Sequence, residues 1–416
     1  MGLYEETRER FERGMKDGRA DTLKVIASVV LSRLRADGEK LRRMKERYRR
    51  IKEGAVGRLE ELVEEARASL RAVGCEVFEA RTGEEAVGYL LDQLEGERVV
   101  VKSKSNTLKE LDLLERLEGR GVEVVETDLG DRIIQLSGEE PLHPVGPAVH
   151  LTLEEVAGAL SREVGRELPP DVEDIIRASK LRLRERILGA RVALTGANAI
   201  AAEEGAIGLV ENEGNISLIT RLPEKHLAVA GIDKIVPTLE EAATVMKTCE
   251  AFLTVTGAYY SFIKGPSRTA DVMGIEQFGM HGAKEVHVVL LDGWRREAVR
   301  KGMGELLYCC NCGACLSVCP VLLETAHAFS SRVGAGPIGV VRTWFVLGPE
   351  EAIRAGLFSC TGCGACREIC PASIDFPRLI ERLRREACSR GLTLPPHSSL
   401  AQNILRVGNP FGEKPE

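Results

Sequence analysis

Short apolar runs and longer amphipathic segments alternate along residues 73–295 of the chain. The first runs are CEVFEA, RVVVKSKS and VEVVETDL, and the segments between them, TGEEAVGYLLDQLEG and TLKELDLLERLEGRG, have a helical pattern. After helical residues 150–189, further runs follow in RVALTGANAI, HLAVAG and EVHVVLLD. Strands that alternate with helices in this way predict a parallel sheet covered by helices. We also interpret AIGLV and ISLIT, which flank the turn residues ENEGN, as a hairpin.

The chain on either side of this α/β region has a helical pattern. Before it lie TLKVIASVVLSRL and KLRRMKERYRRIKEG, and after it GPEEAIRAGLF and DFPRLIERLRREACSRG. In the last of these, Phe376, Leu379, Ile380 and Leu383 form an apolar stripe, and Asp375 is placed to cap the helix. The pattern therefore predicts four parts: an N-terminal helical segment (1–72), an α/β domain (73–295), an all-helical domain (296–390) and a C-terminal tail (391–416).

The composition is that of a globular protein, because 44% of the 416 residues are apolar and 29% are charged. A net charge of −6 argues against a general nucleic-acid binder. No apolar stretch is long enough to span a bilayer, and the N-terminus, MGLYEETRERFERG, lacks the apolar region of a signal peptide. We therefore expect a cytoplasmic protein that is not integral to a membrane. In that compartment cysteines are metal ligands or redox groups before they are disulfides.

Ten of the twelve cysteines follow residue 308, and eight of them form two runs with the spacing C-x2-C-x2-C-x3-C-P. The runs are Cys309, Cys312, Cys315 and Cys319, then Pro320, and Cys360, Cys363, Cys366 and Cys370, then Pro371. The short spacings, helped by Gly313 and Gly364, turn the backbone around a cluster, and in two-cluster ferredoxins the fourth cysteine ligates the other cluster. The runs therefore predict two [4Fe–4S] clusters, one held by Cys309, Cys312, Cys315 and Cys370 and the other by Cys360, Cys363, Cys366 and Cys319.

Zinc sites are the alternative to clusters, and two further features, the cysteines outside the runs and a glycine-rich segment, also need an interpretation. Structural zinc sites also use pairs of C-x2-C knuckles, but two complete runs that each end in proline favour clusters. The remaining cysteines, Cys75, Cys249, Cys310 and Cys388, are expected to be small buried hydrophobic residues rather than ligands. The segment GAGPIG, residues 334–339, matches G-x-G-x-x-G, but no βαβ unit fits around it, so a turn is expected instead of a dinucleotide site.

The α/β domain contains a candidate pocket for a small anionic ligand. The candidate residues are Lys102, Ser103, Lys104, Glu204, Asn212, Gly265, Pro266 and Ser267. The first three lie at the carboxyl end of a predicted strand, where ligands of open parallel sheets bind. A helix follows, and we expect Thr107 and Glu110 to form a capping box at its start. A capped helix with solvated lysines is the alternative interpretation.

The chain resembles a known family in several segments that follow the family's order. They are VVKSKSN, ETDLGDRIIQL, AEEGAIGLVENEGN, LPEKHLAVAGIDKIVPTLEEA, GPSRTAD and GMHGAKEVHVVLLD, followed by the two cysteine runs with GPIGVV between them. This combination resembles the LUD domain and two-cluster ferredoxin domain of the lactate utilisation protein B family. The resemblance covers residues 75 to 385 and implies a NagB/RpiA/CoA-transferase-like α/β fold joined to an all-helical ferredoxin domain.

The resemblance also implies a function. Members of the family serve as the iron–sulfur subunit of an L-lactate-oxidising complex, so we expect electron transfer by a subunit that is not an autonomous enzyme. The implied partners are a CCG-domain subunit, which resembles the catalytic part of heterodisulfide reductase, and a second LUD protein. Two alternatives are a LUD-domain enzyme with acyl or CoA chemistry, and a redox scaffold of a heterodisulfide-reductase-like complex that does not act on lactate.

Overall fold

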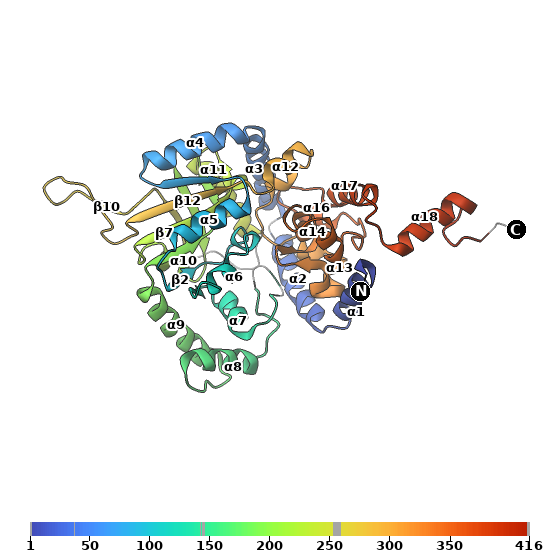
Figure 1. Cartoon of the computed structure of the whole chain (residues 1–416), viewed down its shortest axis with the longest axis horizontal. Helices are drawn as coiled ribbons and strands as arrows, with labels where there is room; N and C mark the ends of the chain where they lie inside the picture. The colour runs from blue at the N-terminus through green and yellow to red at the C-terminus, as the bar shows by residue number, and fades with distance from the viewer. Residues whose placement is uncertain (1, 37, 142, 144–145, 253–258, 414–416) are drawn as a thin grey trace. The chain divides into compact units, whose positions relative to one another are not determined.

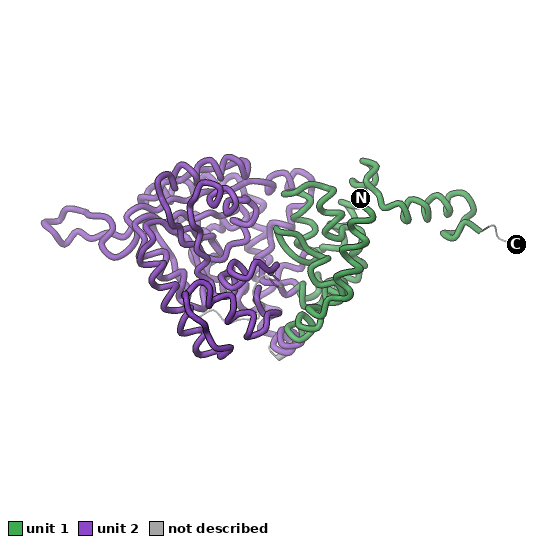
Figure 2. The backbone as a smooth tube through the Cα atoms, turned by 60° about the horizontal axis from the view of Figure 1, so that its bottom comes forward, with its two compact units in different colours: residues 1–27, 315–369, 375–416 green, residues 28–314, 370–374 purple. Residues whose placement is uncertain are grey.

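The computed structural model describes residues 2–36, 38–141, 143, 146–252 and 259–413. These residues form two compact units, which Figure 2 colours separately. Unit 1 contains Met1–Ala27, Cys315–Ile369 and Asp375–Glu416, and unit 2 contains Ser28–Ala314 and Cys370–Ile374. The predicted N-terminal segment is therefore divided between the units within helix α2 (Arg19–Ala36), and unit 2 extends past the predicted boundary at residue 295.

Unit 2 is built around a six-stranded sheet with the order β1-β12-β7-β4-β2-β3, of which Figure 1 labels β12, β7 and β2. Every neighbouring pair is parallel, as the alternation of strands and helices predicts. The strands are β1 (Glu76–Ala80), β2 (Val99–Lys102), β3 (Glu123–Glu126), β4 (Val192–Thr195), β7 (Lys225–Gly231) and β12 (Glu285–Leu291). In a parallel sheet the strands end at one edge, so the residues that follow each strand meet there.

Helices cover both faces of this sheet because successive side chains of a strand point to opposite faces. Val100 packs on one face with α5 (Gly83–Gln93) and α6 (Leu113–Glu118). Its neighbour Val101 packs on the other with α9 (Val172–Gly189) and α10 (Asn215–Ile219). A further apolar cluster joins α9 to α7 (Leu129–Ser137) and α8 (Leu153–Val164).

A second, smaller sheet has the order β8-β5-β6-β9. Its strands are β8 (Ile235–Val236), β5 (Ala199–Ala201), β6 (Ala206–Glu211) and β9 (Tyr259–Ile263). The predicted hairpin is wrong: AIGLV forms β6, but ISLIT forms helix α10. The Glu211 carboxylate accepts hydrogen bonds from the backbone and side chain of Ser217, which holds the chain in a helical turn after β6. The strand β6 instead pairs with β5 and β9.

The other elements of unit 2 are helical apart from one short hairpin. They are α3 (Gly38–Gly57), α4 (Leu59–Ala72), η1 (Leu108–Glu110), η2 (Ile232–Lys234), α11 (Leu239–Ala251), the strands β10 (Arg268–Thr269) and β11 (Gln277–Phe278), α12 (Arg295–Arg300) and η3 (Gly304–Tyr308). The predicted capping box is also wrong. Thr107 makes no side-chain cap, and the Ser105 hydroxyl accepts the Leu108 amide hydrogen instead.

The described residues of unit 1 are helical apart from one antiparallel pair of two-residue strands, which the prediction of an all-helical domain did not include. Its elements are α1 (Leu3–Gly14), η4 (Leu316–Val318), α13 (Pro320–Thr325), η5 (Ala326–Phe329), β13 (Ser330–Ser331), β14 (Gly334–Ala335), α14 (Gly336–Val346), α15 (Pro349–Arg354), α16 (Ala365–Ile369), α17 (Phe376–Ser389) and α18 (Pro395–Val407). In α17 the predicted apolar stripe is buried and Asp375 caps the first turn, as expected. The tail contains α18, which buries none of its residues. No described helix has an apolar stretch long enough to cross a bilayer.

Candidate functional site

The two cysteine runs make the same left-handed turns. In the first run Asn311 and Gly313 have φ values of 60° and 77°, and in the second run Gly362 and Gly364 have φ values of 70° and 79°. These are the same positions relative to the cysteines, so each run makes the same left-handed turns on both sides of its second cysteine. Glycine adopts this region without strain and asparagine tolerates it. The prediction that Gly313 and Gly364 turn the backbone is confirmed.

The fourth cysteine of each run lies with the first cysteines of the other run. Unit 2 contains Cys309 and Cys312 together with Cys370, the last cysteine of the second run. Burial, together with the charges of Cys309 and Cys310, raises the pKa of Cys370 to about 12, so these thiols lie close enough to interact. Cys370 in turn contributes to the raised pKa of Cys312, after a hydrogen bond to Cys310 and burial.

Unit 1 shows the reciprocal arrangement. Burial, together with the charges of Cys360 and Cys363, raises the pKa of Cys319 to about 11. Burial also raises the pKa of Cys366 to about 12, with contributions from Cys319 and the same two thiols. Thiols gathered in this way suit a cluster whose irons each take one thiolate at a separate corner. Among the described residues, no group of three cysteine, histidine, aspartate or glutamate side chains converges to hold one metal ion.

The first cysteine loop is held by side chains from three elements of unit 2. The Tyr48 hydroxyl, on α3, donates to the carbonyl of Tyr308. The Lys234 ammonium, on η2, lies 3.2 Å from the carbonyl oxygen of Cys309, and the Cys249 thiol, on α11, lies 3.3 Å from that of Cys310. Three successive carbonyl groups are thus fixed by donors that are distant in sequence. Cys249 is buried, as expected, but it also positions this loop.

The second run has a cation in the equivalent place. The Arg384 guanidinium, on α17, donates to the carbonyl oxygens of Leu357 at 2.7 Å and Cys360 at 2.6 Å. Lys234 and Arg384 therefore each hold the carbonyl of the first cysteine in a run. Of the other cysteines outside the runs, Cys75 is buried as expected, Cys310 is partly buried and Cys388 is exposed.

Lys234 belongs to a buried network of charges. Its ammonium lies 2.9 Å from Asp233, which also pairs with Arg295. The Arg295 guanidinium lies 3.1 Å from Glu110 and stacks on Trp294. Burial alone would raise the pKa of Asp233, but the charges of Lys234 and Arg295 outweigh it and hold that pKa far below its usual range. The network fixes η2, and through Lys234 it fixes the first cysteine loop.

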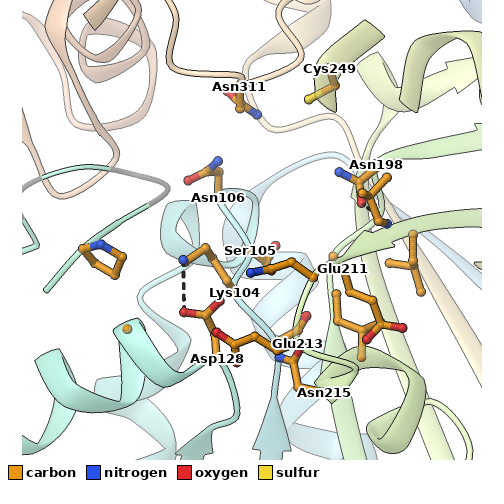
Figure 3. A pocket seen from close by; sticks show the side chains of 18 of the residues that line it. Lys104, Ser105, Asn106, Asp128, Asn198, Glu211, Glu213, Asn215, Cys249 and Asn311 are labelled. Carbon is orange, nitrogen blue, oxygen red and sulfur yellow. Dashed lines mark hydrogen bonds and ion pairs between the residues drawn. The ribbon is translucent and has the colours of Figure 1, made fainter. Parts of the chain in front are cut away.

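A cavity of about 500 Å³ opens in unit 2 at the carboxyl ends of β2, β3 and β4. Figure 3 shows Lys104, Asp128 and Glu213 on one side of it and Cys249 and Asn311 on the other. Its lining is mixed: apolar side chains such as Leu209 and Met246 alternate with hydroxyl, amide and charged groups. The cavity therefore reaches from the edge of the parallel sheet to the first cysteine loop.

Three of the eight predicted pocket residues, Ser103, Lys104 and Asn212, line this cavity. Lys102 is buried behind them and pairs with Glu126. Glu204 lies elsewhere and caps α11, because its carboxylate accepts the Leu239 amide hydrogen at 2.9 Å.

The predicted loop of Gly265, Pro266 and Ser267 lies at the amino-terminal ends of the strands, opposite the ends where the cavity opens. The Ser267 amide donates to the carbonyl of Ala283, which precedes β12, and Gly265 packs against Val73, which precedes β1. These contacts place the loop where the parallel strands begin, whereas the cavity lies where they end. The structure therefore does not bring this loop together with Lys104.

Two acidic residues of the cavity were not predicted as pocket residues. Asp128 lies 3.1 Å from the Lys104 ammonium and is the second residue after β3, as Lys104 is the second residue after β2, so the rule that located Lys104 also applies to it. Burial and the charge of Asp128 raise the pKa of Glu213 to about 7, although its carboxylate accepts the Leu129 amide hydrogen. Burial alone would lower the pKa of Lys104, but Asp131 and Asp128 outweigh it and raise that pKa.

Comparisons with known proteins agree with this architecture. The LUD domain family matches residues 63–291, and the 4Fe-4S dicluster domain family matches residues 305–374. "Lactate utilization protein B" of Geobacillus kaustophilus is 35% identical over 80% of this chain and 70% of its own length, and that of Bacillus pumilus is 32% identical over 86% and 75%. "Uncharacterized electron transport protein YkgF" of Escherichia coli is 33% identical over 84% of this chain and 72% of its own length.

A solved structure was also found, a DUF162 family protein from Deinococcus radiodurans. It is 13% identical, with a TM-score of 0.31 over 56% of this chain and 98% of its own, and at that score it carries no argument about the fold. The two domain matches and the identities over most of the chain do carry one. The chain belongs to the lactate utilisation protein B family, in which a LUD domain is followed by a 4Fe-4S dicluster domain.

Proposed function

We propose that this protein is the iron–sulfur electron-transfer subunit of a multi-subunit L-lactate-oxidising complex. The observation that carries the proposal is the exchange of fourth cysteines, because Cys370 lies with Cys309 and Cys312 while Cys319 lies with the first cysteines of the second run. This arrangement supports two [4Fe–4S] clusters with crossed ligation. One would use Cys309, Cys312, Cys315 and Cys370, with Cys315 assigned from the spacing of the run, and the other Cys360, Cys363, Cys366 and Cys319. When bound, such clusters supply one-electron oxidation and reduction.

The names of the relatives support the proposed role. These names refer to lactate utilization and to electron transport. We propose a CCG-domain redox subunit as the partner, together with a second LUD protein, and the cytoplasm as the compartment, where free cysteines are kept reduced. We also propose that the α/β unit has a NagB/RpiA/CoA-transferase-like fold, which its six-stranded parallel sheet supports.

The first test is iron content. Protein purified without oxygen is expected to carry about eight irons per chain, since two complete cysteine runs each support a four-iron cluster. Colorimetric iron and sulfide analysis with metal mass spectrometry measures this directly. Zinc in place of iron would contradict the assignment, and so would half the expected iron.

The second test asks whether electrons reach the clusters from a partner. A CCG-domain subunit is expected to copurify from the source organism, and the complex is expected to reduce a dye when L-lactate is added. Reduction that other 2-hydroxy acids support but lactate does not would contradict the lactate assignment and leave electron transfer intact. A chain that repeatedly purifies alone would contradict the subunit role.

Lys234 and Arg384 are expected to raise the reduction potentials of the clusters that they adjoin, because reduction adds negative charge near each cation. Lys234→Met is expected to lower the potential of the Cys309 cluster, and Arg384→Met that of the Cys360 cluster, each by tens of millivolts as an order of magnitude. Redox titration followed by electron paramagnetic resonance measures both potentials. The matched control is Arg385→Met on the same helix, whose side chain is 75% exposed. Equal shifts in both clusters for every variant would contradict a local effect.

A further inference from the structure

The cavity of unit 2 contains a buried polar group that the protein itself does not satisfy. Ser103 lines the cavity, is 1% exposed, and its hydroxyl oxygen has no hydrogen-bond partner among the described residues. Leaving a buried hydroxyl without a hydrogen bond costs stability. A ligand that hydrogen-bonds Ser103 would remove that cost. This position follows β2 directly, at the edge where ligands of parallel sheets bind.

The charges of the cavity indicate the kind of ligand that it suits. Lys104 is a cation on its wall, with 23% of its side chain exposed. Asp128 and Asp131 each lie 3.1 Å from its ammonium group, and Lys109 also pairs with Asp131, so two cations face two carboxylates. Glu213 adds a third carboxyl group, which carries no charge once it is protonated, and its pKa of about 7 places that change near neutral pH. Because much of the remaining lining is apolar, the ligand should also contain carbon, which favours an organic acid over an inorganic anion.

The far wall of the cavity belongs to the first cysteine loop. Cys310 and Asn311 both line the cavity, and both lie between Cys309 and Cys312 in the chain. The Cys249 thiol, which also lines the cavity, holds this loop through the carbonyl of Cys310. An occupant of the cavity would therefore contact the loop that we assign to a cluster.

We propose that this cavity binds a small organic acid through Ser103 and Lys104, and that binding is energetically linked to reduction of the cluster held by the Cys309 loop. The proposal rests on the electron-transfer function proposed above and adds to it a ligand site within this chain. Linkage is reciprocal, so a ligand that changes the reduction potential must bind the oxidised and reduced protein with different affinity. An anion near the cluster disfavours added negative charge, so the acid binds the oxidised protein more tightly.

The test uses the anaerobically purified protein with its clusters, titrated with L-lactate and with pyruvate by calorimetry. Inorganic phosphate and glycerol are the comparison probes, since one lacks carbon and the other lacks charge. Binding of either acid is expected to lower the potential of one cluster, and a tenfold preference for the oxidised protein corresponds to about 59 mV for a one-electron couple. The other cluster should not shift.

Two pairs of matched variants locate the site. Ser103→Ala and Lys104→Met are expected to weaken acid binding at least about tenfold, the effect of losing one charged hydrogen bond. The control substitutions, Ser267→Ala and Lys264→Met, lie in the loop at the amino-terminal ends of the strands. These variants should bind the acid as tightly as the unaltered protein does. All four variants should keep their iron, which separates loss of the ligand site from misfolding. Ser103→Ala keeps the ion pairs of Lys104 and so remains informative even where Lys104→Met fails to fold.

Glu213 provides a further readout, which a purely structural role would not move. The groups that act on it are Asp128, Asp131 and Lys104, together with the Leu129 amide. The protonated form tolerates an anion better, so affinity for the acid is expected to fall as the pH rises through about 7, the pKa of Glu213. In Glu213→Gln the affinity should no longer change over this range.

Each outcome separates this inference from the electron-transfer proposal. Protein that carries its iron and accepts electrons from its partner, but binds neither acid, would overturn the inference and leave electron transfer standing. Binding that all four variants retain, or that shifts neither potential, would also overturn it. Acid binding by protein that never assembles clusters would overturn both the linkage and the electron-transfer proposal. Binding of phosphate or glycerol as tight as that of the acids would overturn the assignment of ligand class.

Discussion

Replacing Cys319 with alanine is expected to destroy the cluster of the other run and to spare the cluster of its own. Cys319 lies with Cys360, Cys363 and Cys366, so its loss leaves their cluster without a fourth thiolate. Iron should fall from about eight atoms per chain to about four, the content of one remaining [4Fe–4S] cluster. Cys370→Ala should have the reciprocal effect on the cluster of the first run.

Alkylation followed by peptide mass spectrometry identifies which cluster has been lost, because cysteines bound to iron resist alkylation. In Cys319→Ala, label is expected on the three remaining thiols of its proposed cluster, and those of the Cys309 cluster should stay protected. Cys388→Ala is the control, since that exposed residue lies outside both runs. Label confined to Cys309, Cys312 and Cys315 would refute crossed ligation.

Replacing Arg295 with leucine is expected to lower the free energy of unfolding of unit 2 by about 3–5 kcal/mol, the cost of breaking a buried ion pair from one side. The Arg295 side chain is 2% exposed, and the change leaves Glu110 and Asp233 buried without its charge. Because Asp233 anchors Lys234, the first cysteine loop should loosen as well. Urea denaturation followed by fluorescence measures the stability, and iron content after purification reports on the loop.

The neighbouring Arg296 is a matched control. Its side chain is 22% exposed, and it pairs with Glu60, Glu79 and Asp292, whose side chains are 69%, 22% and 13% exposed. Because solvent reaches Arg296 and screens its ion pairs, Arg296→Leu should lower stability less than Arg295→Leu does. Comparable losses in both variants would show that burial of the pair is not what makes Arg295 important.

Features that depend on near neighbours in the chain were predicted well. The stripe of α17 and its Asp375 cap follow from residues within two helical turns, and the structure has both. The left-handed turns at Gly313 and Gly364 follow from the spacing of each run. Where two local solutions compete, the prediction failed. ISLIT could form a strand or a helix, and hydrogen bonds from Ser217 to the carboxylate of Glu211 favour the helix.

The prediction of the candidate pocket was only partly correct, for a different reason. Ser103 and Lys104 were found because residues after a parallel strand face the binding edge. Gly265 and Ser267 were chosen for their residue types, and only the pairing of β1 with β12 shows that their loop lies where the strands begin. Asp128 could have been chosen by the rule that located Lys104. The residues near Glu213 in the chain do not predict the burial that raises its pKa.

By itself the sequence determined the parallel α/β architecture, the helical cysteine-rich region and the turns of both cysteine runs. Each of these depends on periodicity or spacing, which a few consecutive residues set. Only the tertiary structure decided that Lys234 and Cys249 hold the first cysteine loop and that this loop forms a wall of the cavity beyond Lys104. Those contacts join residues tens to hundreds of positions apart. They depend on how the sheet and helices pack, which the local sequence does not predict.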